Sequence, residues 1–179
     1  MCYHLADKVY HDNFPFDIIV GMVTGGMLPA FRIKQILSYY YCRPIPYIYQ
    51  RGSRKVGGHQ ELDTGDRNNP FIKEGCRALV VEELINYAET TTNGILHERA
   101  KGRIAEDVAC ILFYNNPVAI DRLQRHNIMV HYVMTLEDLL TQAEVMGYYD
   151  VKLIDQYREY LINPQAWHER KGYEFFKGR

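Results

Sequence analysis

The sequence contains no apolar run long enough to cross a bilayer, no excess of either charge and no closely spaced pair of cysteines. Its 179 residues carry a formal net charge of −1, which gives no reason to expect a nucleic acid or an anionic membrane as a partner. The four cysteines stand far apart with no CxxC pair, so we expect reduced thiols and no zinc site. The N-terminal residues, including His4, Asp7 and Lys8, lack the apolar core of a signal peptide. We therefore expect a soluble, cytoplasmic protein.

Strand and helix patterns alternate along the chain. Hydrophobic residues make up 47% of it, which suits one buried core and predicts a single domain over residues 1–179. Strands are expected at about 16–20, 45–49, 77–81, 108–113 and 128–133, and helices at about 2–11, 28–41, 90–100, 116–126 and from 136 onward. This alternation predicts a doubly wound, mainly parallel α/β sheet flanked by helices, followed by a helical segment at about 136–179.

Two of the helix starts carry capping residues. Asn116 followed by Pro117 is typical of a cap and a first helical position. Thr135 to Asp138 approximates a capping box.

The most informative stretch runs from Ala78 to Thr91. Four apolar residues precede Glu82 and Glu83, and a short polar loop then leads to a threonine cluster that begins a helix. An apolar run ending in charge is typical of a buried parallel strand that reaches the sheet edge, where open α/β sheets bind ligands. Carboxylates there can hold sugar hydroxyls or a hard cation, and a helix N-terminus can hold a phosphate. A ribose phosphate is the simplest ligand that needs both, and the structural alternative is a core strand with a solvated acidic end.

This stretch resembles the motif with which type I phosphoribosyltransferases bind phosphoribosyl pyrophosphate (PRPP). Glu82 and Glu83 match the acidic pair of that motif, residues 84–85 match its apolar pair, and residues 86–90 match its loop. Family loops carry Thr and Gly where this chain has Tyr87, Ala88 and Glu89. A carboxylate beside the phosphate would be repelled by roughly 1 kcal/mol or more. The departure therefore implies that Glu89 points away, that the loop register moves toward Thr90, or that the site is weakened.

A second element follows the first strand. Gly21 is followed by Thr24-Gly25-Gly26 and then by Pro29 in the next helix, which is similar to the pyrophosphate loop of the same family. Two consecutive glycines allow a positive φ and a close backbone approach to a ligand, and their N–H groups can form an anion nest. Taken alone, such a turn is also typical of tight packing between a strand and a helix.

The third element is a long stretch, residues 51–70, in which we expect neither a strand nor a helix. Such a stretch inside a domain is typical of a mobile lid, with a surface hairpin as the alternative. Orotate phosphoribosyltransferases carry a mobile loop with the pattern Arg-x-x-x-Lys-x-His-Gly, and Arg51 and Lys55 match its spacing. His59 falls two places late, so it corresponds to the family histidine only if the loop has an insertion. A lid would exclude water from an oxocarbenium-like sugar centre.

The C-terminal third is similar to the orotate branch, because Thr135–Leu140 and Tyr157–Trp167 resemble its closing helices. The resemblance implies transfer of the ribose 5-phosphate of PRPP to orotate, giving orotidine 5′-monophosphate and pyrophosphate in pyrimidine nucleotide biosynthesis. It also implies Mg²⁺ as a cofactor and a homodimer. The site residues implied are Arg51, Lys55, His59, Glu82 and Glu83 for catalysis, Thr24, Gly25, Gly26, Glu82, Glu83, Asn86, Tyr87, Ala88, Glu89, Thr90 and Thr91 for PRPP, and Glu82 and Glu83 for the metal, directly or through water.

Three alternatives stay open at this point. The altered loop is compatible with a non-catalytic regulatory protein of the same fold that binds a nucleotide or PRPP. The first strand and the Gly-Gly turn fit a purine phosphoribosyltransferase equally well. An unrelated α/β protein, such as a response-regulator-like module with an acidic pocket, is the third.

Overall fold

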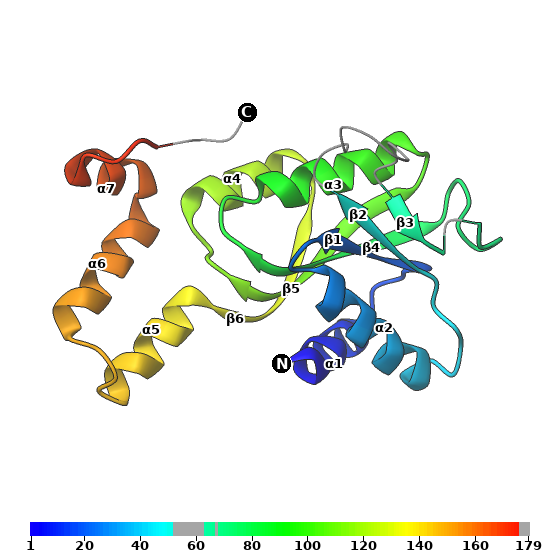
Figure 1. Cartoon of the computed structure of the whole chain (residues 1–179), viewed down its shortest axis with the longest axis horizontal. Helices are drawn as coiled ribbons and strands as arrows, with labels where there is room; N and C mark the ends of the chain where they lie inside the picture. Colours follow the sequence, from blue (N-terminus) through cyan, green and yellow to red (C-terminus); the bar gives the residue numbers. More distant parts are fainter. Residues whose placement is uncertain (52–62, 67, 176–179) are drawn as a thin grey trace.

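The computed structural model describes residues 1–51, 63–66 and 68–175, which form a six-stranded sheet, helices on both of its faces and a C-terminal helical arm (Figure 1). The strand order is β3-β2-β1-β4-β5-β6, and among the described strands only the edge pair β2–β3 is antiparallel. The elements are α1 Cys2–Asp12, β1 Ile18–Val23, α2 Met27–Tyr40, β2 Tyr47–Arg51, β3 Asp63–Gly65, β4 Arg77–Ile85, α3 Glu89–Ala100, β5 Ile104–Phe113, α4 Pro117–Arg125, β6 Met129–Thr135, α5 Leu136–Val145, α6 Val151–Ile162 and α7 Pro164–Lys171.

Helices cover both faces of the sheet, and alternate strand residues belong to opposite layers. Ile18 and Val20 of β1 pack in one core cluster with Ile95 of α3. Ile19, between them, packs in the other cluster with Ile33 of α2. Figure 1 shows α1 and α2 on one side of the strands and α3 and α4 on the other. Because both of its faces are buried, the innermost strand β1 is a continuous apolar run, as expected for a parallel sheet.

The predicted doubly wound sheet is confirmed, and the prediction for residues 51–70 is partly wrong. Asp63–Gly65 form the short strand β3, which pairs with Ile48 to Gln50 of β2. Gly65 has a φ of 116°, and a Cβ atom there would lie 2.8 Å from the carbonyl oxygen of Tyr47, so a side chain would strain the pairing. Residues 52–62 and 67 lie outside the described part of the chain.

Both predicted helix caps are present. Asn116 accepts a hydrogen bond from the N–H of Ala119 at 3.0 Å, and Pro117 is the first residue of α4. Thr135 accepts from the N–H of Asp138 at 3.1 Å, while the Asp138 carboxylate accepts from the N–H of Thr135 at 2.7 Å. These bonds fix where α4 begins, a few residues after β5, and where α5 begins, directly after β6.

His131 of β6 connects α1 to the sheet. Its Nδ1 lies 2.7 Å from a carboxylate oxygen of Asp12, its Nε2 lies 2.8 Å from one of Asp107, and its ring stacks on Phe14 at 4.0 Å between centroids. Burial lowers the pKa of His131, but the hydrogen bonds and charges of Asp107 and Asp12 outweigh burial and raise that pKa above its ordinary value. The imidazolium form therefore stabilises the packing of α1.

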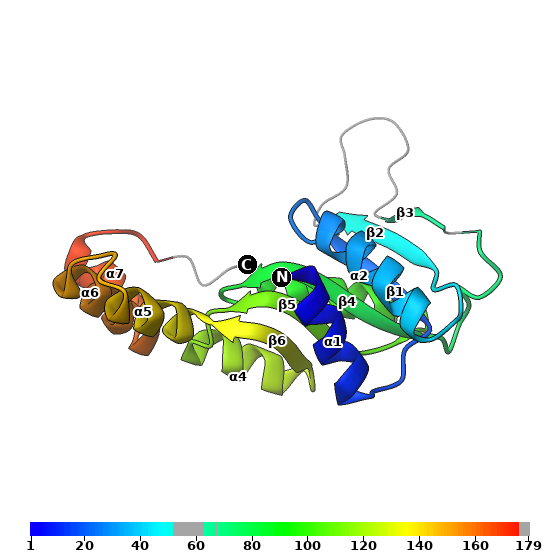
Figure 2. The same ribbon diagram turned by 90° about the horizontal axis from the view of Figure 1, so that it is seen from below.

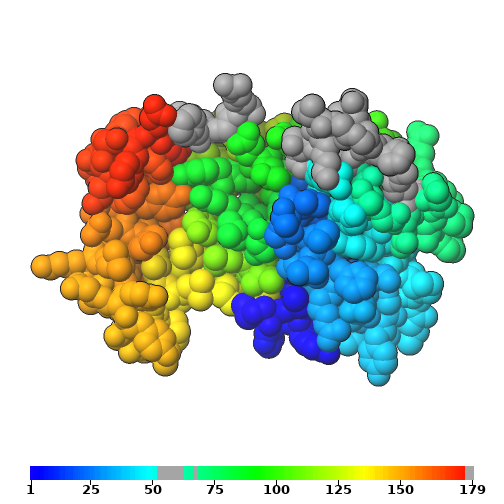
Figure 3. Space-filling view, in the orientation of Figure 1, coloured from blue at the N-terminus to red at the C-terminus, as the bar shows by residue number. Residues whose placement is uncertain are grey.

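Helices α5 to α7 form an arm that extends from the end of β6 away from the sheet (Figure 2). Figure 3 shows the orange and red residues of this arm at one end of the molecule. Within residues 1–51, 63–66 and 68–175, no helix combines the length and the apolar character that crossing a membrane requires.

Candidate functional site

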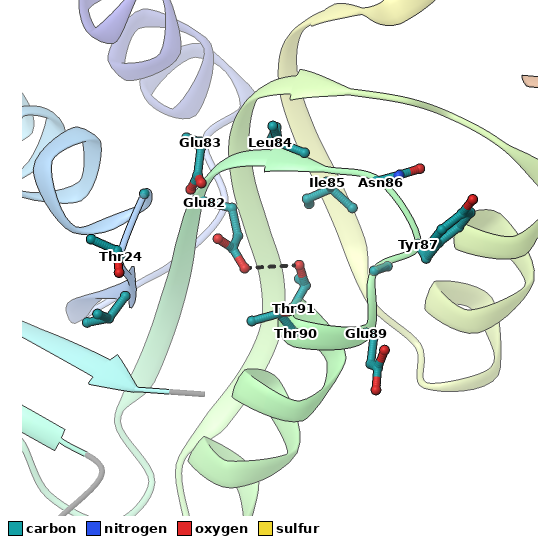
Figure 4. Close-up of a pocket in the computed structure, with 13 residues that line it drawn as sticks. Thr24, Glu82, Glu83, Leu84, Ile85, Asn86, Tyr87, Glu89, Thr90 and Thr91 are labelled. Atoms are coloured by element: carbon teal, nitrogen blue, oxygen red, sulfur yellow. Dashed lines mark hydrogen bonds between the residues drawn. The ribbon is translucent and has the colours of Figure 1, made fainter. Parts of the chain in front are cut away.

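A pocket of about 400 Å³ opens where β1 and β4 end and α3 begins (Figure 4). It brings together the turn after β1, the acidic end of β4 and the loop that leads into α3. This is the edge at which parallel α/β sheets usually bind ligands. The residues that line it are Val23, Thr24, Gly25, Glu82, Glu83, Leu84, Ile85, Asn86, Tyr87, Ala88, Glu89, Thr90 and Thr91.

The two carboxylates leave β4 on opposite faces. Strand alternation places Glu82 on the face of Val80, which packs in the cluster with α3, and Glu83 on the face of Val81, which packs in the cluster with α2. Glu82 thus approaches Thr91 in the first turn of α3, whereas Glu83 approaches the turn after β1. One carboxylate thus lies beside the first turn of α3 and the other beside the turn after β1, on the two sides of the pocket.

Glu82 is buried, with 6% of its surface exposed. Burial, and secondly the negative charge of Glu83, raise the pKa of Glu82 to about 8 from an ordinary value of 4.5. The Thr91 hydroxyl donates a long hydrogen bond of 3.4 Å to Glu82 Oε1, which opposes that rise only in part. At neutral pH Glu82 is therefore mostly protonated, and it is not the solvated acidic strand end that the sequence left open.

Glu83 is packed against the glycine turn. Its Oε2 is buried and has no hydrogen-bond partner among the residues that the structure describes. A Cβ atom on Gly25 would collide with the Glu83 carboxylate, and one on Gly26 would collide with the carbonyl oxygen of Val81. Both glycines therefore permit tight packing of the turn on β4, and this packing holds an unsatisfied carboxylate oxygen at the pocket. Thr24 and Gly25 line the pocket, and Gly26 lies buried beneath them.

The loop before α3 presents a helix N-terminus to the pocket. Ala88, with a φ of 56°, adopts the left-handed conformation immediately before α3, and its methyl side chain cannot cap the helix. Backbone N–H groups of the first turn of a helix attract anions. In Figure 4 the side chains of Tyr87 and Glu89 point away from Glu82 and Thr91, whereas Thr90 and Thr91 lie at the start of the helix. The side-chain directions of Tyr87 and Glu89 therefore leave the helix N-terminus facing the pocket.

Two polar side chains that drew no attention as site residues hold this loop from outside. Asn116 Nδ2 donates to the carbonyl oxygen of Asn86 at 2.9 Å, and Arg122 Nη1 donates to that of Tyr87 at 2.9 Å. The sequence indicated Asn116 only as a helix cap, and gave no signal for Arg122. The hydroxyl of Tyr160 on α6 also reaches the loop, lying 3.0 Å from Asn86 Oδ1.

Comparison with known proteins decides the family. No protein-family model matches the chain. The chain is 28% identical to the orotate phosphoribosyltransferase of Sinorhizobium fredii over 158 residues, which are 88% of this chain and 63% of that protein. It is 31% identical to the orotate phosphoribosyltransferase of Coxiella burnetii over 156 residues, which are 87% of this chain and 69% of that protein. The chain belongs to the orotate phosphoribosyltransferase family.

A solved orotate phosphoribosyltransferase, from Francisella tularensis, has the same fold. The two structures match with a TM-score of 0.65 at 14% identity over 89% of this chain and 75% of that one. The predicted type I phosphoribosyltransferase fold is therefore confirmed, and an unrelated α/β protein is excluded. The chain spans 63% of the length of its Sinorhizobium relative.

The lid residues expected of an orotate phosphoribosyltransferase fall partly outside the described chain. Arg51 is the last residue of β2 and pairs in register with Val23, so it stands beside the turn that carries Thr24. Lys55 and His59 lie outside the described residues, and their roles stay predictions.

A second polar cluster lies between β3 and α3, away from the residues that line the pocket. Asp63 has a carboxylate oxygen 3.2 Å from His97 Nε2, and Glu98 is fully buried near both. Lys101 pairs with Asp63, and Arg103 pairs with Glu98. Each carboxylate thus already has a cation, and a metal ion would have to displace Lys101. We interpret this cluster as the anchor that holds β3 on α3.

Proposed function

We propose that this chain is an orotate phosphoribosyltransferase that transfers the ribose 5-phosphate of PRPP to orotate and releases pyrophosphate. Its membership of the family supports the proposal. The observation that carries it is the arrangement of one pocket, in which two carboxylates at the end of β4 lie opposite the N-terminus of α3. A ribose 5-phosphate needs both features, because its hydroxyls bind carboxylates and its phosphate binds backbone N–H groups.

The two carboxyl groups offer different hydrogen bonds to a ribose. Glu82, with a pKa of about 8, carries a proton at neutral pH and can donate it to one hydroxyl oxygen. Glu83 Oε2, which has no partner within the described chain, can accept from a hydroxyl. A donor beside an acceptor is complementary to the two adjacent hydroxyls of a ribose, and it would fix the sugar relative to the leaving group.

Glu82 and Glu83 also fit Mg²⁺, because carboxylate oxygens are its preferred protein ligands and one of theirs is unsatisfied. Bound Mg²⁺ would neutralise charge on the leaving pyrophosphate. To bind Mg²⁺ directly, Glu82 must lose its proton, and it then accepts from the ribose hydroxyl instead of donating to it. We therefore expect Mg²⁺ binding near pH 7 to release close to one proton per chain, measured by calorimetry in two buffers of different ionisation enthalpy. Binding without proton release would exclude Glu82 as a direct ligand.

The remaining groups bind the two anionic ends of PRPP in this proposal. The Thr24–Gly25 turn seats the pyrophosphate, and the backbone from Asn86 to Thr91 seats the 5′-phosphate. Arg51, Lys55 and His59 would stabilise the charge that develops on pyrophosphate as the lid closes. Support for the 5′-phosphate assignment comes from the N–H groups of α3, which begin at the pocket wall.

The test measures pyrophosphate release from PRPP and Mg²⁺ with orotate, uracil, adenine and hypoxanthine in turn. Release with orotate alone would support the proposal, and release with a purine alone would move the chain to the purine branch. The matched control is the double variant Glu82→Gln with Glu83→Gln. It should fold, as judged by circular dichroism, and lose PRPP binding. Wild-type PRPP and Mg²⁺ binding in that variant would show that the pocket is wrongly assigned.

A second candidate is a regulatory protein that binds PRPP without turnover, and the loop residues Tyr87, Ala88 and Glu89 favour it. The same assay separates the two functions. PRPP binding measured by calorimetry, with no pyrophosphate released for any base, would select the regulatory function.

The proposal extends to a homodimer, a cytoplasmic location and a place in pyrimidine nucleotide biosynthesis. The four cysteines all lie in the described chain and are free thiols, which suits a reducing compartment. If the lid acts across a dimer interface, mixing Lys55→Ala chains with Glu82→Gln chains should restore part of the activity that each lacks alone. Failure of complementation, together with a monomer in sedimentation equilibrium, would remove the dimer from the proposal.

A further inference from the structure

Tyr160 of α6 contacts the loop of residues 86–88 before α3, which we call the phosphate loop, although it lies more than seventy residues away in the sequence. Its hydroxyl lies 3.0 Å from Asn86 Oδ1 and 2.8 Å from the hydroxyl of Tyr87. Asn86 Oδ1 also accepts from Asn116 Nδ2 at 3.1 Å. The loop is thus attached to the C-terminal arm on one side and to α4 on the other.

The number of available protons determines which hydroxyl donates and which accepts in this contact. Each tyrosine hydroxyl has one proton to donate, and Asn86 Oδ1 can only accept. Tyr160 satisfies both contacts when it donates to Asn86 and accepts from Tyr87. Burial, and then the bond to Tyr160, raise the pKa of Tyr87, which agrees with a neutral Tyr87 acting as donor. The three side chains then form one connected chain of hydrogen bonds.

Aromatic packing holds Tyr160 in place. Its ring meets that of Trp167 edge-on at 5.6 Å between centroids, and that of His168 lies 5.9 Å away. The ring of Tyr87 meets that of Phe175 edge-on at 5.6 Å, so the loop tyrosine enters the same aromatic cluster. This aromatic cluster holds the bulky side chain of Tyr87 away from Glu82 and Thr91, as Figure 4 shows for that ring.

We propose that Tyr160 is a positioning residue that holds the loop from Asn86 to Ala88 in the conformation that presents the N-terminus of α3 to a phosphate. The inference rests on the proposed function only for the identity of the phosphate, which would be the 5′-phosphate of PRPP. The C-terminal arm thereby becomes a determinant of phosphate affinity, although the structure shows none of its residues lining the pocket.

The variant Tyr160→Phe tests this role, because it keeps the ring and removes the hydroxyl. The matched control is Tyr157→Phe on the same helix, where the residue is 50% exposed. We expect Tyr160→Phe to weaken ribose 5-phosphate binding by about fivefold to tenfold, because the loop loses both hydrogen bonds of the Tyr160 hydroxyl, to Asn86 and to Tyr87. Pyrophosphate binds at the other wall in our assignment, so its affinity should stay unchanged. A general loss of stability would weaken both ligands.

Hydrogen exchange provides a readout that needs no ligand. The backbone amides of residues 86–91 should exchange faster in Tyr160→Phe than in the wild type and in Tyr157→Phe, with other amides unaffected. Unchanged exchange in this loop, or equal weakening of both ligands, would overturn the positioning role.

The failure of the proposed function is recognised separately. If the wild-type chain binds ribose 5-phosphate but releases no pyrophosphate with any base, the proposed activity is wrong. The positioning role is then decided by whether Tyr160→Phe weakens the binding of ribose 5-phosphate more than that of pyrophosphate. A wild-type chain that binds neither ribose 5-phosphate nor pyrophosphate overturns both.

Discussion

Replacing Glu82 by glutamine should stabilise the ligand-free protein while it removes the function. Glu82 is 6% exposed and its pKa is raised to about 8, first by burial and second by the charge of Glu83. A carboxyl whose pKa is higher in the folded than in the unfolded chain binds its proton more tightly when folded. The folded state therefore loses stability as the pH rises from the unfolded value toward the folded one.

The magnitude follows from these two values. The interval between 4.5 and about 8 corresponds to roughly 5 kcal/mol at about 1.4 kcal/mol per pH unit. Most of this cost, on the order of 3 kcal/mol, is already present at pH 7, and it is below about 1 kcal/mol at pH 5. Glutamine remains neutral at every pH, its oxygen can keep the bond from Thr91, and its amide can donate to the unsatisfied Glu83 Oε2.

The assay is urea unfolding followed by far-UV circular dichroism at about pH 5 and about pH 8. The measured quantity is the free energy of unfolding of Glu82→Gln minus that of the wild type. We expect this difference to be on the order of 3 kcal/mol larger at about pH 8 than at about pH 5. The control is Glu106→Gln on the adjacent strand β5, which makes the same substitution at a carboxylate that is 58% exposed. A gain that is equal at both pH values, or a loss at pH 8, would refute a buried, protonated Glu82.

Three further outcomes are expected. Lys55→Ala should lower turnover far more than PRPP affinity, because charge builds on pyrophosphate mainly in the transition state; an equal loss in both would indicate a solvated loop. Glu89→Thr should change PRPP affinity by less than about threefold, since the Glu89 side chain points away from Glu82 and Thr91, and a tightening of about tenfold or more in calorimetry would place its carboxylate beside the phosphate. His131→Ala should cost about 1–3 kcal/mol in urea unfolding near pH 6. That cost should shrink as the pH rises through the raised pKa of His131, because neutral imidazole keeps only one N–H donor, so the wild type then loses one of its two hydrogen bonds and the charge attraction to Asp12 and Asp107. A constant cost would indicate packing alone.

Local sequence signals predicted the fold well where one short segment determines the outcome. The caps at Asn116 and Thr135 were correct because capping needs only the residue and its next helical turn. The acidic pair toward the carboxyl end of the sheet was expected, but the strand predicted at 77–81 continues as β4 to Ile85, so Glu82 and Glu83 lie within the strand and not after it. The pocket follows from these strand ends, since the carboxyl ends of parallel strands meet at one edge.

Features that depend on partners distant in the sequence were not predictable. The strand β3 has three residues, too few for a periodic pattern, and it exists because Asp63 and Thr64 pair with β2. The sequence marked Glu82 as acidic, but its protonation depends on burial beneath α3 and on Glu83 across the strand. Nothing near Tyr160 in the sequence indicates that its hydroxyl reaches Asn86.

The phosphate loop departs from the family pattern in its side chains, but its backbone still presents the N-terminus of α3 to the pocket. A phosphate at a helix N-terminus binds backbone N–H groups, so the side chains matter only if they disturb the backbone or enter the pocket. Tyr87 is drawn outward toward Tyr160 and Phe175, and Glu89 points away from Glu82. Ala88 adopts the left-handed conformation that glycine would adopt without strain, at a cost of about 1 kcal/mol. These three residues change the side chains around the N-terminus of α3 while its backbone still faces the pocket, and for this reason catalysis is the first proposal and regulation the second.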